Sequence, residues 1–117
     1  MDRRIEVVIS NMEAQCSRAW EVAELATLVN LSGSRLRHLF KQETGTTPAQ
    51  YLKTVRLRKA SVLLRTTFMS VKEIAITVGL TTASYFVREF RKSYGMTPTE
   101  YRNSAVRSTA REYRRVR

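Results

Sequence analysis

Residues that support covalent cross-linking and the common forms of catalysis are scarce in this sequence. It contains one cysteine, Cys16, so an internal disulfide is excluded and a reducing compartment fits. It contains one histidine, His38, so neither a metal cluster nor a Ser-His-Asp arrangement finds support, and there is no glycine-rich phosphate-binding loop. We therefore expect no enzyme, no metal site and no cofactor.

Long apolar runs and acidic residues are also few. The longest uncharged stretch, residues 74–87, is too short and too rich in threonine to cross a bilayer, and no basic-then-apolar leader opens the chain. Ten acidic residues stand against 21 lysines and arginines, a formal charge of +11. Such an excess favours a polyanionic partner, nucleic acid first and an anionic membrane surface second. With 43% apolar residues among 117, we expect a soluble cytoplasmic protein of one domain, or of two small subdomains that share a core.

A phrase that occurs twice organises the sequence. "GTTPAQY" at 45–51 returns as "GMTPTEY" at 95–101, fifty residues on. Before it, "VAELATLVNLS" at 22–32 runs parallel to "VKEIAITVGLT" at 71–81, 49 residues on. The one extra residue of the second copy falls between Leu80 and Phe86, where we expect a turn. An internal repeat of this kind indicates one structural unit used twice.

The spacing of apolar residues predicts the structure of that unit. Each copy has them at i, i+3, i+4 and i+7, the stripe of an amphipathic helix. They are Val22, Leu25, Ala26 and Val29 in the first copy and Val71, Ile74, Ala75 and Val78 in the second. Asn30 and Gly79 follow, at a place that favours a left-handed residue, and a second helix begins after a short turn. Each copy is therefore predicted to be helix, tight turn, helix.

The repeated phrase separates one helix from the next. Its glycine is expected to end a helix, its threonine to cap the following one, and its proline to take the first helical position, where no N–H is needed. Gln50 and Glu100 lie three residues after the threonines and complete capping boxes. Ser70 and Glu73 predict a further box, whereas Glu21 is a weaker cap at the matching place in the first copy.

An opening helix and a long middle helix complete the predicted outline. Residues 48–64 are apolar on more than one face, which indicates a connector packed on several sides and holding the two units in fixed relation. No segment shows strand alternation, so we expect an all-α fold of about seven helices. The expected parts are an opening helix and first helix-turn-helix at 1–47, a linker helix at 48–66, a second helix-turn-helix and the start of a last helix at 67–101, and a basic, flexible tail at 102–117.

The sequence resembles the DNA-binding domain of the AraC/XylS family of bacterial transcription regulators. The similarity covers roughly residues 5–102 and rests on "ELATLVNLSGSRLRHLFKQETGTTPAQYL", "RLRKASVLL" and "EIAITVGLTTASYFVREFRKSYGMTPTEYR". The resemblance implies a sequence-specific regulator, such as an activator, whose two recognition helices enter successive major grooves of promoter DNA. Two recognition helices in one chain can bind two half-sites without a dimer, so we expect a monomer on DNA. We also expect the protein to be associated with the nucleoid and to contact RNA polymerase.

The outward faces of the two recognition helices supply the candidate base contacts. In the first copy the family's base-facing positions fall on Ser34, Arg37 and His38. Arg37 is the best single candidate, because bidentate arginine to guanine is the commonest specific contact, whereas His38 fits a solvated face equally well. The matching positions in the second copy are Ala83, Ser84, Val87 and Arg88. Two of these four are apolar, so we expect the first half-site to be read more strictly.

Other basic residues are candidate phosphate contacts. They are Arg35, Lys41, Arg56, Arg91 and Lys92. For Arg56 and its neighbour Arg58 an internal ion pair with Glu24 or Glu73 is an equal alternative. The tail carries six arginines and one glutamate and is expected to add a nonspecific attraction to phosphates, or to serve only as a solubilising end.

Three further residues carry structural expectations. Trp20 and Cys16 are expected to be buried rather than to stack on a base or to do redox chemistry. Glu89 takes the place that Leu39 holds in the first copy. We expect it at a solvated edge, the alternative being looser packing of the second unit.

The main alternative function is a charge-driven architectural or RNA-binding module. It would show a steep salt dependence and equal affinity for scrambled duplexes. The two recognition helices carry different outward residues, which binding by charge or shape alone would not need. A membrane-surface role is disfavoured because the apolar stripes are used inside the bundle. The sequence leaves open whether the chain is a stand-alone regulator or the DNA-binding portion of a longer protein, and whether it activates or represses.

Overall fold

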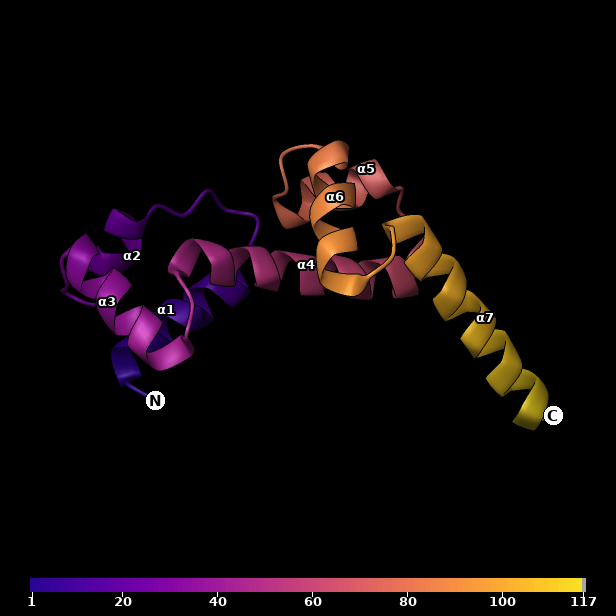
Figure 1. Ribbon diagram of the computed structural model, residues 1–117, viewed down its shortest axis with the longest axis horizontal. Coiled ribbons are helices and arrows are strands. Elements are labelled where there is room, and N and C mark those ends of the chain that lie inside the picture. The colour runs from indigo at the N-terminus through magenta and orange to yellow at the C-terminus, as the bar shows by residue number, and fades with distance from the viewer. Residues whose placement is uncertain (117) are drawn as a thin grey trace. The chain divides into compact units, whose positions relative to one another are not determined.

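The computed structural model describes residues 1–116 of the 117, with side chains as far as Arg115. Over this range the chain is all-α, and its helices follow one another as labelled in Figure 1. They are α1 Arg3–Ala14, α2 Val22–Leu28, α3 Gly33–Thr44, α4 Pro48–Thr66, α5 Val71–Val78, α6 Ala83–Tyr94 and α7 Pro98–Val116. The predicted fold class and number of helices are confirmed. Within the described part of the chain, none of the helices combines the length and the hydropathy that a bilayer-spanning segment needs.

The chain forms two compact units, one from Met1 to Arg56 and one from Leu57 onward. The boundary falls inside α4, so each unit uses one half of that helix. The interior of unit 1 includes Ile5, Met12, Leu25, Leu36 and Phe40, and that of unit 2 includes Leu64, Ile74, Val78, Phe86 and Phe90. Each copy of the repeat thus buries its apolar face in a core of its own, rather than in the shared core considered above.

The turn inside each helix-turn-helix is built in the same way in both units. The residue after the turn donates its N–H to the carbonyl oxygen five residues earlier, over 3.0 Å from Leu31 and 2.9 Å from Leu80. This bond requires a left-handed residue just before it. Asn30 supplies it with φ 61° and Gly79 with φ 89°, which confirms both predictions.

The one-residue shift between the copies lies at Thr81. Ser32 caps α3 and Thr82 caps α6, and each hydroxyl oxygen accepts the N–H three residues on at 3.1 Å. Ser32 follows Leu31 directly, whereas Thr81 stands between Leu80 and Thr82. The extra residue therefore lies in the turn, as expected, and leaves the helices themselves in register.

The repeated phrase ends one helix and caps the next, as predicted. Gly45 and Gly95 end α3 and α6 in the left-handed region, with φ of 79° and 75°. The threonine oxygens that follow accept the N–H groups of Gln50 and Glu100 at 3.2 Å. In unit 2 the carboxylate of Glu100 also accepts the N–H of Thr97 at 2.9 Å, and this backbone hydrogen bond is the main cause of a lowered pKa at Glu100.

The caps of α2 and α5 differ in strength, also as predicted. Ser70 and Glu73 form a reciprocal box with both hydrogen bonds at 3.1 Å, and the bond from the Ser70 N–H lowers the pKa of Glu73. In unit 1 the carboxylate of Glu24 accepts the N–H of Glu21 over 3.5 Å. The longer distance makes this bond weaker than the matching bond from Ser70 to Glu73.

The tyrosine of each phrase holds the recognition helix against the next helix. The rings of Phe40 and Tyr51 meet edge to face with centroids 5.5 Å apart, and those of Phe90 and Tyr101 do so at 5.3 Å. Edge-to-face pairs of this kind contribute about 0.5–1.5 kcal/mol beyond the area they bury. The phrase therefore recurs because each unit needs the same stop, cap and aromatic contact.

Replacing Gly45 by alanine is expected to lower the free energy of unfolding by about 1–2 kcal/mol. The cause is the positive φ of 79° alone, because no atom lies within 4 Å of the place where a Cβ would stand. Gly45→Asn should cost less, since asparagine already serves at Asn30. Urea denaturation followed by circular dichroism compares the two variants. A Gly45→Ala protein as stable as the wild type would show that the left-handed turn is not required.

An arginine in the last helix of each unit braces the end of the first helix. Arg56 donates from Nε to the carbonyl oxygen of Cys16 at 2.7 Å and from Nη2 to that of Arg18 at 2.8 Å. Arg102 donates from Nε to the carbonyl oxygen of Leu64 at 2.9 Å. The braces do not appear as a sequence repeat, because the two arginines stand one helical turn apart when the copies are aligned.

Cys16 and Trp20 lie in the same turn as the carbonyls that Arg56 bonds. Cys16 is buried, as predicted. Trp20 is only half-buried: it packs against the core of unit 1, and its Nε1–H donates to the carbonyl oxygen of Gln15 at 2.9 Å. The guanidinium of Arg18 covers the Trp20 ring at 4.2 Å from the centroid, so the ring is occupied by contacts within the protein.

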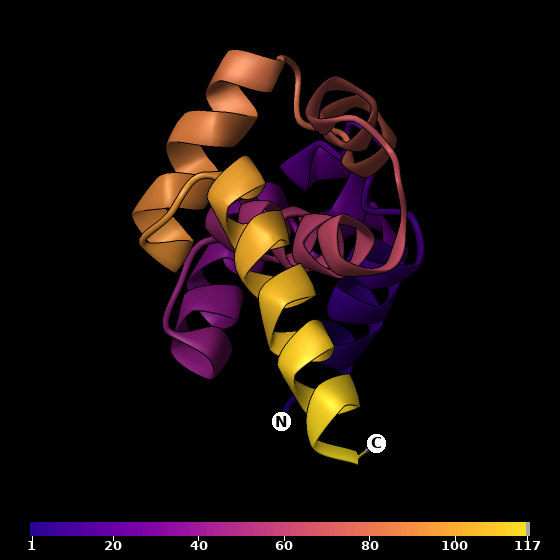
Figure 2. The same ribbon diagram turned by 90° about the vertical axis from the view of Figure 1, so that its right-hand side faces the viewer.

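The expected flexible tail at 102–117 is instead helical as far as the structure describes it. Helix α7 continues to Val116, and Arg117 lies outside the described residues. Figures 1 and 2 both show the C-terminal half of α7 extending away from α5 and α6. The prediction was wrong because residues 99–116 contain no glycine or proline, and a start packed at Tyr101 supplies the costly nucleus from which a helix propagates.

Candidate nucleic-acid interface

The outward face of α3 carries the first-copy candidates. Leu36 and Phe40 are fully buried and anchor the opposite face of the helix in unit 1. Five polar and basic side chains on the other side are exposed: Ser34, Arg35, Arg37, His38 and Lys41. Positions 34, 37, 38 and 41 follow the i, i+3, i+4, i+7 spacing, so the structure brings them together as one stripe.

The outward face of α6 carries the second-copy candidates. Phe86 and Phe90 are fully buried on the inner side. The six predicted contacts line a single shallow groove: Ala83, Ser84, Val87, Arg88, Arg91 and Lys92. Ala83 and Val87 are half-buried, and the other four are exposed, so the groove combines a small apolar surface with a polar and cationic one.

Glu89 lies beneath this face, and the expectation of a solvated edge was wrong. Its side chain is only 7% exposed and its carboxylate lies 3.4 Å from Nε of Arg88 and 3.5 Å from Nζ of Lys92. The ring of Tyr85 lies 5.4 Å from the Arg88 guanidinium on the same surface. A carboxylate is tolerated in such a place only with cationic partners, and both partners here are candidate DNA contacts. Glu89 therefore helps to position the cations of the α6 face.

Arg56 does not belong with the other phosphate candidates. Its side chain is half-buried, and its guanidinium bonds the two carbonyl oxygens after α1 described above. These partners are main-chain oxygens, whereas the alternative expectation was an ion pair with the carboxylate of Glu24 or Glu73. Main-chain carbonyls that face a distant helix are not visible in the sequence, which is why this brace was missed. Arg58, two residues on, is exposed.

The two faces carry chemical groups that are suited to contacting nucleic acid. They present guanidinium, ammonium, hydroxyl and imidazole groups beside small apolar side chains, which is the set that reads base edges and phosphates. In the part of the chain that the structure covers, no three side chains of His, Cys, Asp or Glu gather as a metal ion would require.

The chain has relatives of known class in sequence. A family model described as a helix-turn-helix domain matches residues 25–104, a range that includes α3 and α6. The transcriptional activator RhaR of Mannheimia succiniciproducens is 38% identical over 104 residues, which cover 89% of this chain and 38% of that protein. The transcriptional regulator GadX of Escherichia coli is 34% identical over 106 residues, covering 91% and 37%. The chain thus spans little more than a third of the length of these relatives.

Solved structures agree in fold. An AraC-type DNA-binding domain from Chromobacterium violaceum superposes with a TM-score of 0.84 at 30% identity, covering 88% of this chain and 92% of that one. The DNA-binding domain of AdpA, in complex with a target DNA, gives 0.81 at 28% identity, covering 86% and 91%. The predicted family is confirmed: the chain belongs to the AraC-type family of helix-turn-helix DNA-binding transcription regulators.

Proposed function

We propose that the chain regulates transcription by binding double-stranded promoter DNA with sequence preference, with α3 and α6 in two successive major grooves. The observation that carries the proposal is the likeness of the two helices: each buries an apolar face that includes a phenylalanine, and each carries its candidate contacts on the opposite side at matching positions. Successive major grooves on one side of B-DNA are roughly 34 Å apart. The AdpA domain, of the same fold and in complex with a target DNA, supports the binding of DNA by this fold.

The proposed contacts divide into three kinds. Arg37 pairs with a guanine edge, with Ser34 and His38 beside it. On α6, Ser84 and Arg88 offer polar contacts, while Ala83 and Val87 contact thymine methyl groups. The phosphate contacts are Arg35, Lys41, Arg91 and Lys92. The first half-site is accordingly read more strictly than the second.

The chain acts on DNA as a monomer in the cytoplasm, associated with the nucleoid, and contacts RNA polymerase. A dimer is unnecessary because α3 and α6 belong to one chain. When one of these helices is bound, the covalent link keeps the other at a high effective concentration near its half-site. Analytical ultracentrifugation of the protein with one duplex should give one chain per site.

Selection of bound sites from a random duplex library tests the proposal. We expect enrichment of an asymmetric site of roughly 20 bp that spans two major grooves. A selection that returns no shared motif, with equal affinity for scrambled duplexes and a steep salt slope, would instead identify a charge-driven binder.

Arg37→Ala is expected to relax the preference at one or two base pairs by about 1–3 kcal/mol, with the salt slope little changed. The matched control is Arg35→Ala on the same helix. As a phosphate contact, it should weaken binding to all sequences and reduce the slope of log K against log salt by about 0.9. Repeating the selection and the salt titration with both variants separates the two roles. A uniform loss with Arg37→Ala would make that residue a phosphate contact.

A further inference from the structure

The exposed half of α7 carries a continuous row of arginines. Every residue from Val106 to Arg115 is exposed. At 3.6 residues per turn, four arginines fall within an arc of about 100° on the helix surface. They are Arg107, Arg111, Arg114 and Arg115, and we call them the arginine strip. Glu112 lies outside that arc. The strip is therefore a row of positive charges along one side of the helix.

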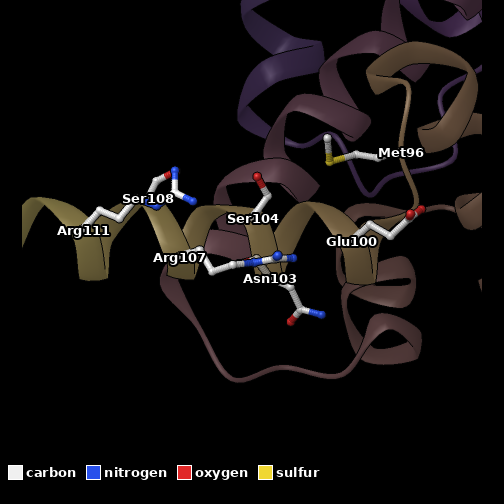
Figure 3. A pocket seen from close by; sticks show the side chains of 7 residues that line it. All are labelled: Met96, Glu100, Asn103, Ser104, Arg107, Ser108 and Arg111. Carbon is white, nitrogen blue, oxygen red and sulfur yellow. The ribbon is translucent and has the colours of Figure 1, made fainter.

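A shallow groove connects the start of α7 with the strip. Met96, Glu100, Asn103, Ser104, Arg107, Ser108 and Arg111 line one shallow groove along α7, drawn in Figure 3. At its start, Arg91 of the α6 face lies near enough to Glu100 to contribute, after the Thr97 hydrogen bonds, to the lowered pKa of that carboxyl. Glu100 stays ionised, as its lowered pKa indicates, and its negative charge lies at the start of the groove, before the first arginine of the strip.

The length and charge of the strip fit the phosphate backbone of a duplex. From Arg107 to Arg115 the helix rises about 12 Å. Over that distance B-DNA presents about seven phosphate charges. A membrane surface is the other polyanion to consider, but it requires a broad apolar face opposite the basic one. Between Val106 and Arg115, where the side chains are described, only Val106 and Tyr113 are large exposed apolar side chains.

We propose that the arginine strip is an additional DNA contact, which binds backbone phosphates flanking the half-site read by α6. This inference rests on the proposed function, because it requires that α6 lie on DNA. In this arrangement unit 2 has two contact surfaces, one that reads bases and one that adds affinity for any sequence. The affinity that the strip adds compensates for the small number of polar base contacts that the α6 face offers.

The test is a salt titration of binding by fluorescence anisotropy, on the selected duplex and on a scrambled one. The variant replaces all four arginines of the strip by glutamine, which keeps a comparable helix propensity. We expect the slope of log K against log salt to fall by about 3–4 and the affinity to fall about tenfold or more on both duplexes. The ratio of specific to scrambled affinity should stay constant.

Two matched controls accompany this variant. The corresponding lysine variant keeps the charge and should keep most of the slope. The double variant Arg107→Gln/Arg111→Gln is compared with Arg3→Gln/Arg65→Gln, which removes two exposed arginines from other helices. Only the first pair should lower the slope appreciably. Trimming the base pairs that flank the selected site should weaken the wild type and leave the four-glutamine variant unaffected.

A four-glutamine variant with the wild-type slope and affinity would overturn the proposal. So would a variant that binds DNA normally but loses binding to phosphatidylserine-containing vesicles, because the strip would then face a membrane. If the wild-type chain selects no motif, the proposed function fails instead. The slope on a scrambled duplex would still report whether the arginines contact DNA.

Discussion

Phe90→Ala is expected to lower the free energy of unfolding by about 3–5 kcal/mol, the usual cost of truncating a buried phenylalanine. Phe90 is fully buried in α6 and contacts three aromatic rings. Its centroid lies 5.6 Å from that of Phe86, 4.3 Å from that of Tyr94 and 5.3 Å from that of Tyr101. Because whole domains are stable by only about 5–15 kcal/mol, unit 2 should become marginal and lose its part in DNA binding. Chemical denaturation followed by circular dichroism measures the loss.

The chain offers a matched control for this change. Phe68 is fully exposed, so Phe68→Ala is the same substitution without a buried contact and should alter stability by no more than about 0.5 kcal/mol. If Phe90→Ala leaves too little folded protein, Phe90→Leu should fold at a smaller cost. Equal losses from Phe90→Ala and Phe68→Ala would show that the aromatic cluster does not hold α6.

Arg56→Met is expected to cost about 2–3 kcal/mol of stability while leaving the salt slope of DNA binding unchanged. Methionine keeps the apolar stem of the side chain but leaves the carbonyl oxygens of Cys16 and Arg18 without their charged donor. The slope should hold because a guanidinium used inside unit 1 neutralises no phosphate. Thermal denaturation and a salt titration on the same preparation give both quantities.

Arg58→Met serves as the comparison, since it removes an exposed arginine from the same helix two residues away. Its effect on stability should stay within about 0.5 kcal/mol. A stable Arg56→Met protein with a reduced salt slope would restore Arg56 as a phosphate contact. In that event the hydrogen bonds to the carbonyl oxygens would be dispensable.

The repeat made the helices and their ends predictable, because the deciding interactions are local. A left-handed residue, a capping hydroxyl and a proline at the first helical position act within a few residues of one another. Asn30, Gly79 and the two phrases could therefore be placed from the sequence. The inward faces of α3 and α6 followed from helical spacing alone, and their outward residues could be named by subtraction.

Three features could not be predicted, each because it depends on partners that sequence spacing does not reveal. The brace at Arg56 depends on two main-chain carbonyls in the turn after α1, which are distant in sequence. The burial of Glu89 depends on Arg88 and Lys92, for which helical spacing predicts outward contacts only. The helical course of residues 102–116 was missed because a high density of arginine was interpreted as a tail, although the absence of glycine and proline was the better guide.

The separate interiors of the two units have a consequence for how such a regulator changes its targets. The first interior stops at Val55 and the second starts at Leu57, so a substitution that repacks one leaves the other untouched. Distant, independent substitutions combine additively. Under the proposed binding mode, one half of the DNA site can thus change in sequence while the other half is still bound by an unaltered helix. Such a regulator can acquire new target sites by single substitutions. No intermediate protein then loses affinity for both half-sites at once.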